Sequence, residues 1–423
     1  MALRNRAGKY TVFLTRKFKH FANIPFSRYI TVPVRTKPYR PTIALAGGGH
    51  ANLYALRRTG ELTGRGFDVV LVDPSEHLHY SGMATGVLSG SYEPGENRIG
   101  IRRLVERGGG RFVRGRVAEV QHRDRTLLLE DGRTVRYDAV SFCLGSETRG
   151  ADGTVPVKPV SDLEGVRKRL MAAETGAASR VVIFGGGAAG CEVAANLAGL
   201  VDGGLGVEIT LVEAAPDLLP TSPKAARRIM RGHLRDLGVD LILGRQGVAV
   251  NGGAILENGE EIRADLVLAA TGVDPPDVFA RSGLATGDHG ALWVDRHLRS
   301  PNDHRIFGGA DAVAFRGNPL PRFGVLAIRQ GPVLFHNLRA TLRGQQLSSY
   351  RPQRRYLYVL DLGDGTGLAI YGPLTNRSRP ALRLKHLRGR RFVREYGQGA
   401  PLGWEISGGL DSPRRPQRCP FSG

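Results

Sequence analysis

Short apolar runs that lead into glycine-rich turns are the most regular feature of the chain. Residues 42–46 (TIALA) form one such run, and a second run over 67–73 (FDVVLVD) ends in Asp73. Continuous apolar runs of this length, bounded by turn residues, are typical of buried strands. The segment 50–60 between them predicts a helix, so this region is expected to form a β-α-β unit.

The same pattern returns further along the chain. Residues 180–184 (RVVIF) predict a strand, an alanine-rich helix follows, and residues 207–213 (VEITLVE) predict a second strand that ends in Glu213. The turn between strand and helix has the complete spacing Gly-x-Gly-x-x-Gly, formed by Gly185, Gly187 and Gly190. This spacing inside a β-α-β unit is typical of dinucleotide binding.

The first turn has only part of that spacing. Gly47 and Gly49 fill the first two positions, and Asn52 stands at the third. The third glycine serves close packing of helix on strand, whereas backbone N–H groups at the helix N-terminus hold the pyrophosphate. We therefore expect Asn52 to shift the helix slightly and the turn still to bind. His50 and Ala51 are counted as binding residues, although His50 could equally be a first-turn residue hydrogen-bonded to solvent.

An acidic residue ends the second strand of each unit. A carboxylate at this place accepts hydrogen bonds from the ribose hydroxyls of a dinucleotide. Two such units predict two dinucleotides, a resident FAD and a transient NADH. Glu213 would repel the 2′-phosphate of NADPH, and no arginine immediately follows it, which favours NADH.

The formal charge of +21 is concentrated at the two ends of the chain. Residues 1–40 hold ten Lys or Arg and no acid, and from Arg377 onward eleven bases face three acids. This distribution favours basic arms that touch an anionic surface and does not favour a nucleic-acid-binding fold. Residues 14–21 are either part of a disordered extension or a basic helix on an anionic membrane, and residues 379–396 are either a similar helix or an exposed basic segment.

Cysteine usage excludes several site classes. Cys143, Cys191 and Cys419 are far apart, and no C-x-x-C pair or His cluster has metal-ligand spacing. We expect no metal site, and a reducing cytoplasmic location, with attachment to the inner face of the plasma membrane left open.

Three further segments complete a family pattern. Residues 137–147 (with Gly145) and 264–276 (with Gly272) are similar to the A-T-G turns of the pyridine nucleotide-disulfide oxidoreductase superfamily, and "IFGGADAV" resembles its "IFAAGDxA" strand. By this resemblance Asp311 would hydrogen-bond the ribityl chain of FAD. Within the superfamily the chain most resembles type II NADH dehydrogenases and the flavoprotein module fused to selenide, water dikinase, whose "GGGHAH" is close to "GGGHAN" here.

The resemblance implies an α/β fold with two Rossmann-like domains, the NAD(H) domain inserted in the FAD domain, and a small C-terminal α+β segment. The expected parts are a basic extension (1–40), the FAD domain (41–155 and 275–345), the NAD(H) domain (156–274), a C-terminal domain (346–399) and a disordered tail (400–423).

Departures from the family restrict the chemistry. Residues 74–95 contain no cysteine, so electrons cannot leave the flavin through a dithiol there, and Cys143 and Cys191 are expected to be packing residues. In the family's quinone-contact motif Gln330 matches the second Gln, but Ala327 replaces the first. By resemblance Glu192 lies close to the nicotinamide; a solvated carboxylate at the helix start is the alternative.

The sequence therefore predicts an FAD-dependent NADH dehydrogenase. Hydride would pass from NADH to the flavin, and electrons would continue to a quinone or another small acceptor, with Glu192 and Gln330 as candidate catalytic residues. A redox sensor or partner-binding flavoprotein with little turnover is the alternative, and a homodimer is left open.

Overall fold

A computed structural model describes residues 2–4, 10–12, 39–150, 152–172, 178–201, 206–315, 320 and 322–398. Met1–Arg40 and Pro41–Gly423 form separate units. In the first unit β1 (Ala2–Arg4) pairs antiparallel with β2 (Tyr10–Val12). The predicted helix over 14–21, the tail 400–423 and Cys419 lie outside the described residues.

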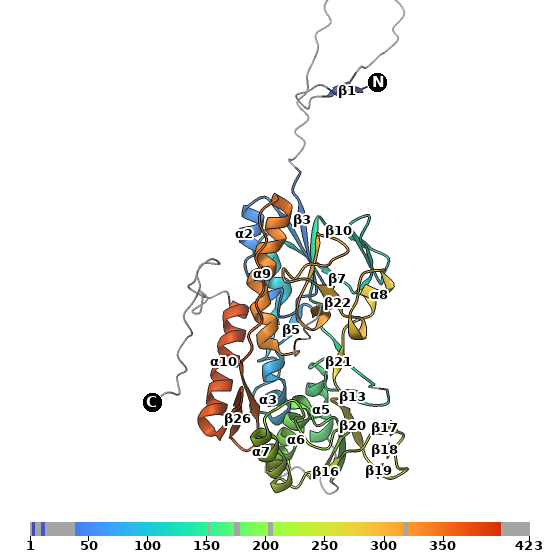
Figure 1. Ribbon diagram of the computed structural model, residues 1–423, viewed down its shortest axis with the longest axis vertical. Helices are drawn as coiled ribbons and strands as arrows, with labels where there is room; N and C mark the ends of the chain where they lie inside the picture. The colour runs from blue at the N-terminus through green and yellow to red at the C-terminus, as the bar shows by residue number, and fades with distance from the viewer. Residues whose placement is uncertain are drawn as a thin grey trace, which may run out of the picture. The chain divides into compact units, whose positions relative to one another are not determined.

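The second unit contains a five-stranded parallel sheet in the order β23-β11-β3-β4-β7 (Figure 1). Its strands are β3 (Thr42–Ala46), β4 (Asp68–Asp73), β7 (Arg111–Arg114), β11 (Ala139–Phe142) and β23 (Ile306–Gly308). The inner strands are almost wholly apolar and buried, because helices and a second small sheet cover both faces. That small antiparallel sheet consists of β8 (Val117–Gln121), β9 (Thr126–Leu129) and β10 (Thr134–Arg136).

A second five-stranded parallel sheet has the order β13-β20-β14-β15-β16. Its strands are β13 (Val155–Pro156), β14 (Ser179–Phe184), β15 (Val207–Glu213), β16 (Asp240–Leu243) and β20 (Leu266–Ala269). The antiparallel strands β17 (Gly247–Val250), β18 (Gly253–Leu256) and β19 (Glu261–Arg263) lie between β16 and β20 in sequence. Because β23 returns to the first sheet after this segment, the second Rossmann-like sheet is inserted in the first, which confirms the predicted fold class. The finer domain boundaries stay a prediction.

Helices join and cover these strands. They are α1 (Leu53–Arg57), α2 (Thr59–Gly64), α3 (Ala84–Ser89), α4 (Ile101–Arg107), α5 (Asp162–Met171), α6 (Ala188–Val201), α7 (Lys224–Asp236), α8 (Val278–Arg281), α9 (Gly324–Arg343) and α10 (Arg379–Gln398). Short elements of the first half are β5 (His77–His79), η1 (Ser81–Met83), β6 (Arg98–Gly100) and β12 (Glu147–Thr148). Those of the second half are β21 (Val273–Asp274), η2 (Asp288–Gly290), β22 (Leu292–Val294), η3 (Ala310–Ala312) and β24 (Val313–Phe315).

The predicted helix over 50–60 is divided into α1 and α2. Arg58 between them leaves the helical region at φ −99° and ψ 20°. The buried Thr59 hydroxyl donates to the Leu56 carbonyl at 2.8 Å, so this carbonyl is already engaged by a side chain where the two helices meet.

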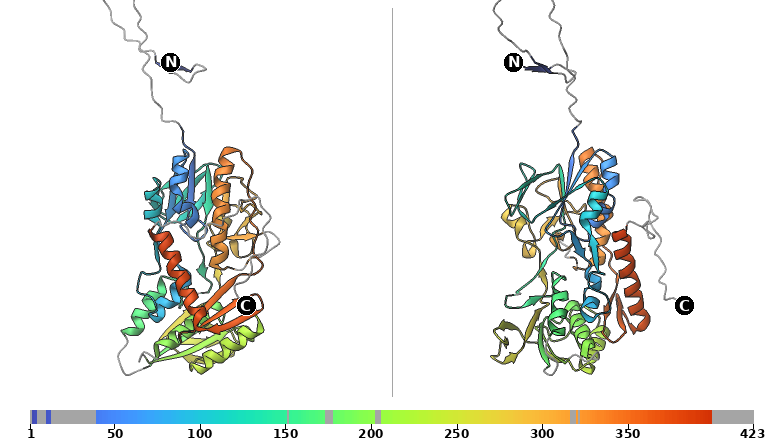
Figure 2. Two further views of the ribbon diagram at one scale, coloured as in Figure 1. Left: turned by 90° about the vertical axis from the view of Figure 1, so that its left-hand side faces the viewer. Right: turned by 180° about the vertical axis from the view of Figure 1, so that it is seen from behind.

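The C-terminal segment is α+β, as predicted. The antiparallel strands β25 (Leu357–Asp361), β26 (Gly367–Tyr371) and β27 (Leu374–Ser378) lead directly into α10, which packs along them (Figure 2). Residues 379–396 are therefore helical. Attachment of this helix to an anionic membrane stays a prediction. In the described part of the chain, every helix is too short or too polar to cross a membrane.

Candidate functional site

The first glycine turn is built against the end of β11. Gly47 has φ +86°, and a Cβ there would lie 2.2 Å from the Cys143 carbonyl oxygen. A Cβ on Gly49 would lie 2.5 Å from the Cys143 sulfur. Only glycine fits at both positions, and the buried Cys143 forms the floor of the turn.

The two acidic strand ends have the same geometry. Asp73 accepts hydrogen bonds from the Gly48 N–H at 2.7 Å and the Ser75 N–H at 2.8 Å. Glu213 accepts from the Gly186 N–H and, at 2.6 Å, from the Ala215 N–H. Burial raises the pKa of Asp73, although these backbone hydrogen bonds oppose the shift. Each unit therefore holds its carboxylate beside the backbone of its own turn, at Gly48 in the first unit and Gly186 in the second. A ribose-binding acid requires this position.

The third positions of the two turns differ in what they do. A Cβ on Gly190 would lie 1.8 Å from the Gly185 carbonyl oxygen, so that turn requires glycine. In the first turn the buried Asn52 donates from Nδ2 to the carbonyls of Gly47 (2.8 Å) and Ser141 (3.1 Å). The Ser141 hydroxyl in turn donates to Asn52 Oδ1 at 2.7 Å. Asn52 thus ties the turn to β11, a role that the sequence did not indicate.

His50 lies behind the turn in an aromatic environment. Its ring centroid is 5.6 Å from that of Tyr80 and 6.3 Å from that of Phe392. Burial, aided by the charge of Lys158, lowers its pKa to about 4, so the ring is neutral at pH 7. Nε2 is buried and has no hydrogen-bond partner among the described residues, which does not support the predicted solvent-bonded alternative.

Asp311 lies in η3, just after β23, and makes an ionic contact that the sequence did not predict. Its carboxylate accepts from the Lys158 ammonium and, at 2.8 Å, from the Ser146 hydroxyl. Burial alone would raise the pKa of Asp311, but the charge and hydrogen bond of Lys158 hold it below the usual value. Lys158 lies more than a hundred residues before Asp311, so no local signal identifies the pair.

Gln330 supports the Asp311 loop. It is buried in α9, and its Oε1 accepts from the Ala310 N–H at 2.6 Å. Ala310 has φ +61°, in the region that favours glycine, and the Gln330 hydrogen bond helps to hold this conformation. The amide predicted to contact an acceptor thus already bonds the backbone beside Asp311.

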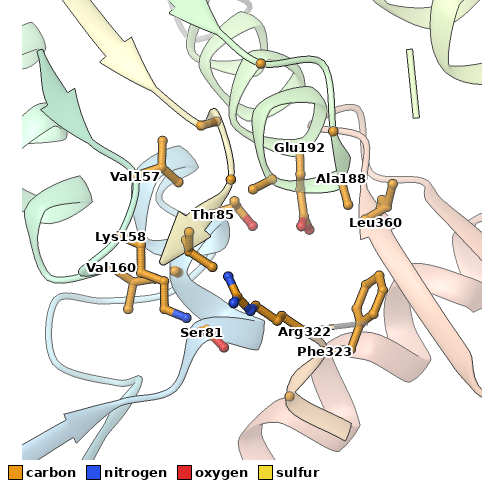
Figure 3. A pocket seen from close by; sticks show the side chains of 18 of the residues that line it. Ser81, Thr85, Val157, Lys158, Val160, Ala188, Glu192, Arg322, Phe323 and Leu360 are labelled. Carbon is orange, nitrogen blue, oxygen red and sulfur yellow. The ribbon is translucent and has the colours of Figure 1, made fainter. Parts of the chain in front are cut away.

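A cavity of about 1210 Å³ lies between the two parallel sheets. In Figure 3 the side chains of Lys158, Glu192 and Arg322 point into it from three separate segments. Of the predicted site residues, the cavity wall includes Gly185, Gly187, Glu192, Glu213, Gly272 and Asp311. The wall does not include Gly47, Gly49, His50, Ala51, Asp73, Gly145, Gly190 and Gln330.

Glu192 is held by the C-terminal segment. Its Oε1 accepts from the Lys385 ammonium of α10 and from the Asp361 N–H at 2.8 Å. The side chains of Glu192 and Lys385 are only 13% and 12% exposed. The solvated alternative for Glu192 therefore does not describe this carboxylate, which points into the cavity as one half of an ion pair.

The described cysteines are unpaired packing residues. Cys143 and Cys191 are buried, and burial raises the pKa of the Cys143 thiol to about 12. Within the described ranges, three or more His, Cys, Asp or Glu side chains do not gather at a metal-binding distance.

The chain is similar to known proteins over most of its length. It is 26% identical over 399 residues to the alternative NAD(P)H-ubiquinone oxidoreductase C1 of Arabidopsis thaliana, covering 80% of this chain and 76% of that protein. It is 24% identical over 361 residues to demethylphylloquinone reductase NdbB of Synechocystis, covering 79% and 89%. The sulfide:quinone oxidoreductase structure from Aquifex aeolicus has a TM-score of 0.74 at 16% identity, covering 85% and 92%, which shows the fold alone.

The family model for pyridine nucleotide-disulphide oxidoreductases matches residues 41–331, which include both glycine turns and Asp311. The match spans both sheets described above. The chain belongs to the pyridine nucleotide-disulphide oxidoreductase family.

Proposed function

We propose that this FAD-dependent NAD(P)H oxidoreductase is an NADH dehydrogenase that passes electrons to a quinone-like acceptor without a redox disulfide. The observation that carries the proposal is the pair of matching glycine–carboxylate units with one cavity between their sheets. Members of this family bind FAD and NAD(P)H.

The first unit fits FAD. The turn at Gly47 and Gly49 packs so closely on Cys143 that a Cβ has no room. Glycines at these positions suit the tight turn of a pyrophosphate-binding loop. The unpartnered Nε2 of His50 beside this turn is a buried polar atom that a bound group can satisfy. Gly47, Gly49, Ala51, Asp73 and Gly145 would hold the dinucleotide, and Asp311 its ribityl chain. When bound, FAD supplies the two-electron redox chemistry.

The second unit fits the nicotinamide coenzyme. Gly185, Gly187 and Gly190 would hold its pyrophosphate, and Glu213 would bind its adenosine ribose. Gly272 would form part of the cavity wall around the coenzyme. Glu192 is oriented by Lys385 and the Asp361 N–H, so its carboxylate stays in the cavity as a hydrogen-bond acceptor for the nicotinamide end.

A quinone-like acceptor is supported by the relatives and by cysteine placement. The two curated relatives are named for ubiquinone and demethylphylloquinone. Cys143 and Cys191 are buried and separate, so neither supplies a dithiol for electron exit. Three expectations remain predictions: the likeness to the dikinase-fused module, attachment to an anionic membrane, and homodimer formation. The exposed Leu387 among the arginines of α10 is compatible with attachment to a membrane surface.

The redox-sensor alternative has one observation in its favour. Gln330 Oε1 already accepts from the Ala310 N–H, and the buried Ala327 has no polar side chain, so neither position offers a free amide oxygen to an acceptor. A sensor would bind both dinucleotides and turn over slowly.

The test is anaerobic spectroscopy of the purified, flavin-loaded protein. Bleaching of the flavin band at about 450 nm by NADH, and its return with menadione, supports the dehydrogenase. Bleaching without return on menadione favours the sensor. If dithionite bleaches the band and NADH does not, the hydride donor is wrong. A Gly190→Val variant is the control: it should keep the flavin band and lose its response to NADH, because its side chain meets the Gly185 carbonyl.

A further inference from the structure

Arg245 lies beside Glu213 at the carboxyl edge of the second sheet. In the parallel pair β15–β16, Glu213 is opposite Leu243. Two residues further, the Arg245 N–H donates to the Glu213 carbonyl at 3.1 Å, and the Gly244 N–H donates to the Ala215 carbonyl at 3.0 Å. The backbone of Arg245 is therefore fixed about one strand spacing, some 4.8 Å, from that of Glu213.

Glu213 is fixed as firmly. Its two carboxylate oxygens accept from Gly186 and Ala215, so the side chain cannot swing away from a ligand without losing both hydrogen bonds. Each oxygen still has a lone pair for a ribose hydroxyl. A 2′-phosphate at the same place would meet an immovable negative charge unless a cation lies next to it.

Arg245 can be that cation. It lines the cavity together with Glu213 and Gln246, and its side chain is exposed. Among the described residues it has no side-chain hydrogen bond or ion pair, and it does not pair with Glu213. A guanidinium offers five N–H donors in a planar fork, which matches phosphate oxygens.

We propose that Arg245 allows the site to accept NADPH in addition to NADH by pairing with the 2′-phosphate beside Glu213. The inference rests on the proposed nicotinamide site, whose substrate class it widens. No arginine directly follows Glu213 in the sequence. Arg245 instead follows the neighbouring strand β16, more than thirty residues later.

The two residues should act in opposite directions. Arg245 attracts only the phosphorylated ligand, because an unmodified 2′-hydroxyl carries no charge. Glu213 repels the phosphorylated ligand and accepts a hydrogen bond from the unmodified ribose. Substitution of Arg245 therefore changes discrimination between the coenzymes, whereas simple damage to the site would weaken both.

The experiment measures binding by calorimetry to the flavin-loaded protein, with ADP-ribose and 2′-phospho-ADP-ribose as non-reducing probes. We expect the parent protein to bind both. Arg245→Ala should weaken 2′-phospho-ADP-ribose at least tenfold and ADP-ribose less than twofold, and Glu213→Gln should strengthen 2′-phospho-ADP-ribose. Arg228→Ala is the matched control, because Arg228 is an exposed arginine of α7 outside the cavity wall.

Each outcome decides between the two proposals. The role of Arg245 would be overturned by any of three results. Arg245→Ala could weaken the binding of both probes equally, it could weaken neither, or the parent protein could fail to bind 2′-phospho-ADP-ribose. Normal discrimination without NADH oxidation would refute the dehydrogenase and leave the Arg245 inference intact. Failure of ADP-ribose itself to bind would overturn both.

Discussion

Replacement of Asn52 by alanine tests whether this residue holds the first turn in place. The change removes three hydrogen bonds, from Asn52 Nδ2 to the carbonyls of Gly47 and Ser141 and from the Ser141 hydroxyl to Asn52 Oδ1. Asn52 and Ser141 are both 0% exposed, so water cannot replace the lost partners. A net hydrogen bond contributes about 1 kcal/mol, and an unsatisfied buried hydroxyl costs about 1–3 kcal/mol. We expect Asn52→Ala to lower the free energy of unfolding by about 3 kcal/mol.

A double-mutant cycle with Ser141→Ala separates the parts of this loss. Ser141→Ala alone should cost about 2 kcal/mol, because it removes one hydrogen bond and leaves the buried Asn52 Oδ1 without a donor, while Nδ2 keeps its two carbonyl partners. In the double variant the orphaned hydroxyl is gone, so the losses should be less than additive by about 1–2 kcal/mol. The free energy of unfolding of each variant is measured by urea denaturation, with flavin release as the signal. Additivity within about 0.5 kcal/mol would refute the pairing of Asn52 with Ser141.

Asn337 supplies a matched control. It is also 0% exposed, and its amide makes three hydrogen bonds, to the His297 carbonyl and to the carbonyl and N–H of Ser348. Asn337→Ala should cost a similar free energy of unfolding and leave flavin affinity unchanged, whereas Asn52→Ala should weaken flavin binding as well. Equal flavin affinity in the two variants would contradict the role of Asn52 in holding the turn.

Three further predictions concern protonation and reactivity. Burial lowers the pKa of His50 from 6.5 to about 4, so between these pH values the unfolded chain binds more protons than the folded protein. The free energy of unfolding should therefore fall by up to about 3 kcal/mol as the pH drops from about 6.5 to about 4. His50→Phe should flatten this part of the curve of unfolding free energy against pH. Lys158→Met should lower stability at pH 7 by about 2 kcal/mol, because it leaves the buried Asp311 carboxylate with the Ser146 hydroxyl alone. The difference from the parent should narrow below about pH 3.8, as the pH approaches the lowered pKa of Asp311 in the folded parent and the protonated carboxyl no longer attracts Lys158. Denaturation at pH 7 and below pH 3.8 checks this, and an unchanged difference would contradict the ion pair. In a Cys419→Ser background, the two buried thiols should not react with a disulfide reagent at pH 8 until the protein unfolds, and prompt labelling of the native protein would show that the site has an accessible thiol.

The sequence predicted the elements whose signals are local. Apolar runs predicted β3, β4, β14 and β15, and glycine spacing with a strand-end acid predicted both dinucleotide units. These features depend on neighbouring residues only. Their order along the chain resembles that of the family, and the fold class was predicted from this resemblance.

Contacts between distant residues could not be predicted in this way. Ser141 meets Asn52, Lys158 meets Asp311, and Arg245 stands beside Glu213 only after the sheets have formed. No periodicity or motif marks these pairs, because a side chain's partner across a sheet depends on strand order and register. The division of the helix over 50–60 has the same origin, since it accompanies the burial of Thr59.

The C-terminal segment touches both dinucleotide-binding parts, and this limits how the protein can move. Gly363, in the β25–β26 turn, lies so close to α6 that a Cβ there would be 2.1 Å from the Ala195 carbonyl, and α10 continues from the same sheet to pack against β6 and η1. A hinge that opened one Rossmann-like part from the other would have to pull the strands from α6 or the helix from β6. We therefore expect the C-terminal segment to hold the two Rossmann-like parts at a fixed spacing. Removing the chain from β25 onward would leave every glycine and acid of the two units in place, yet we expect it to free the two Rossmann-like parts to move relative to one another.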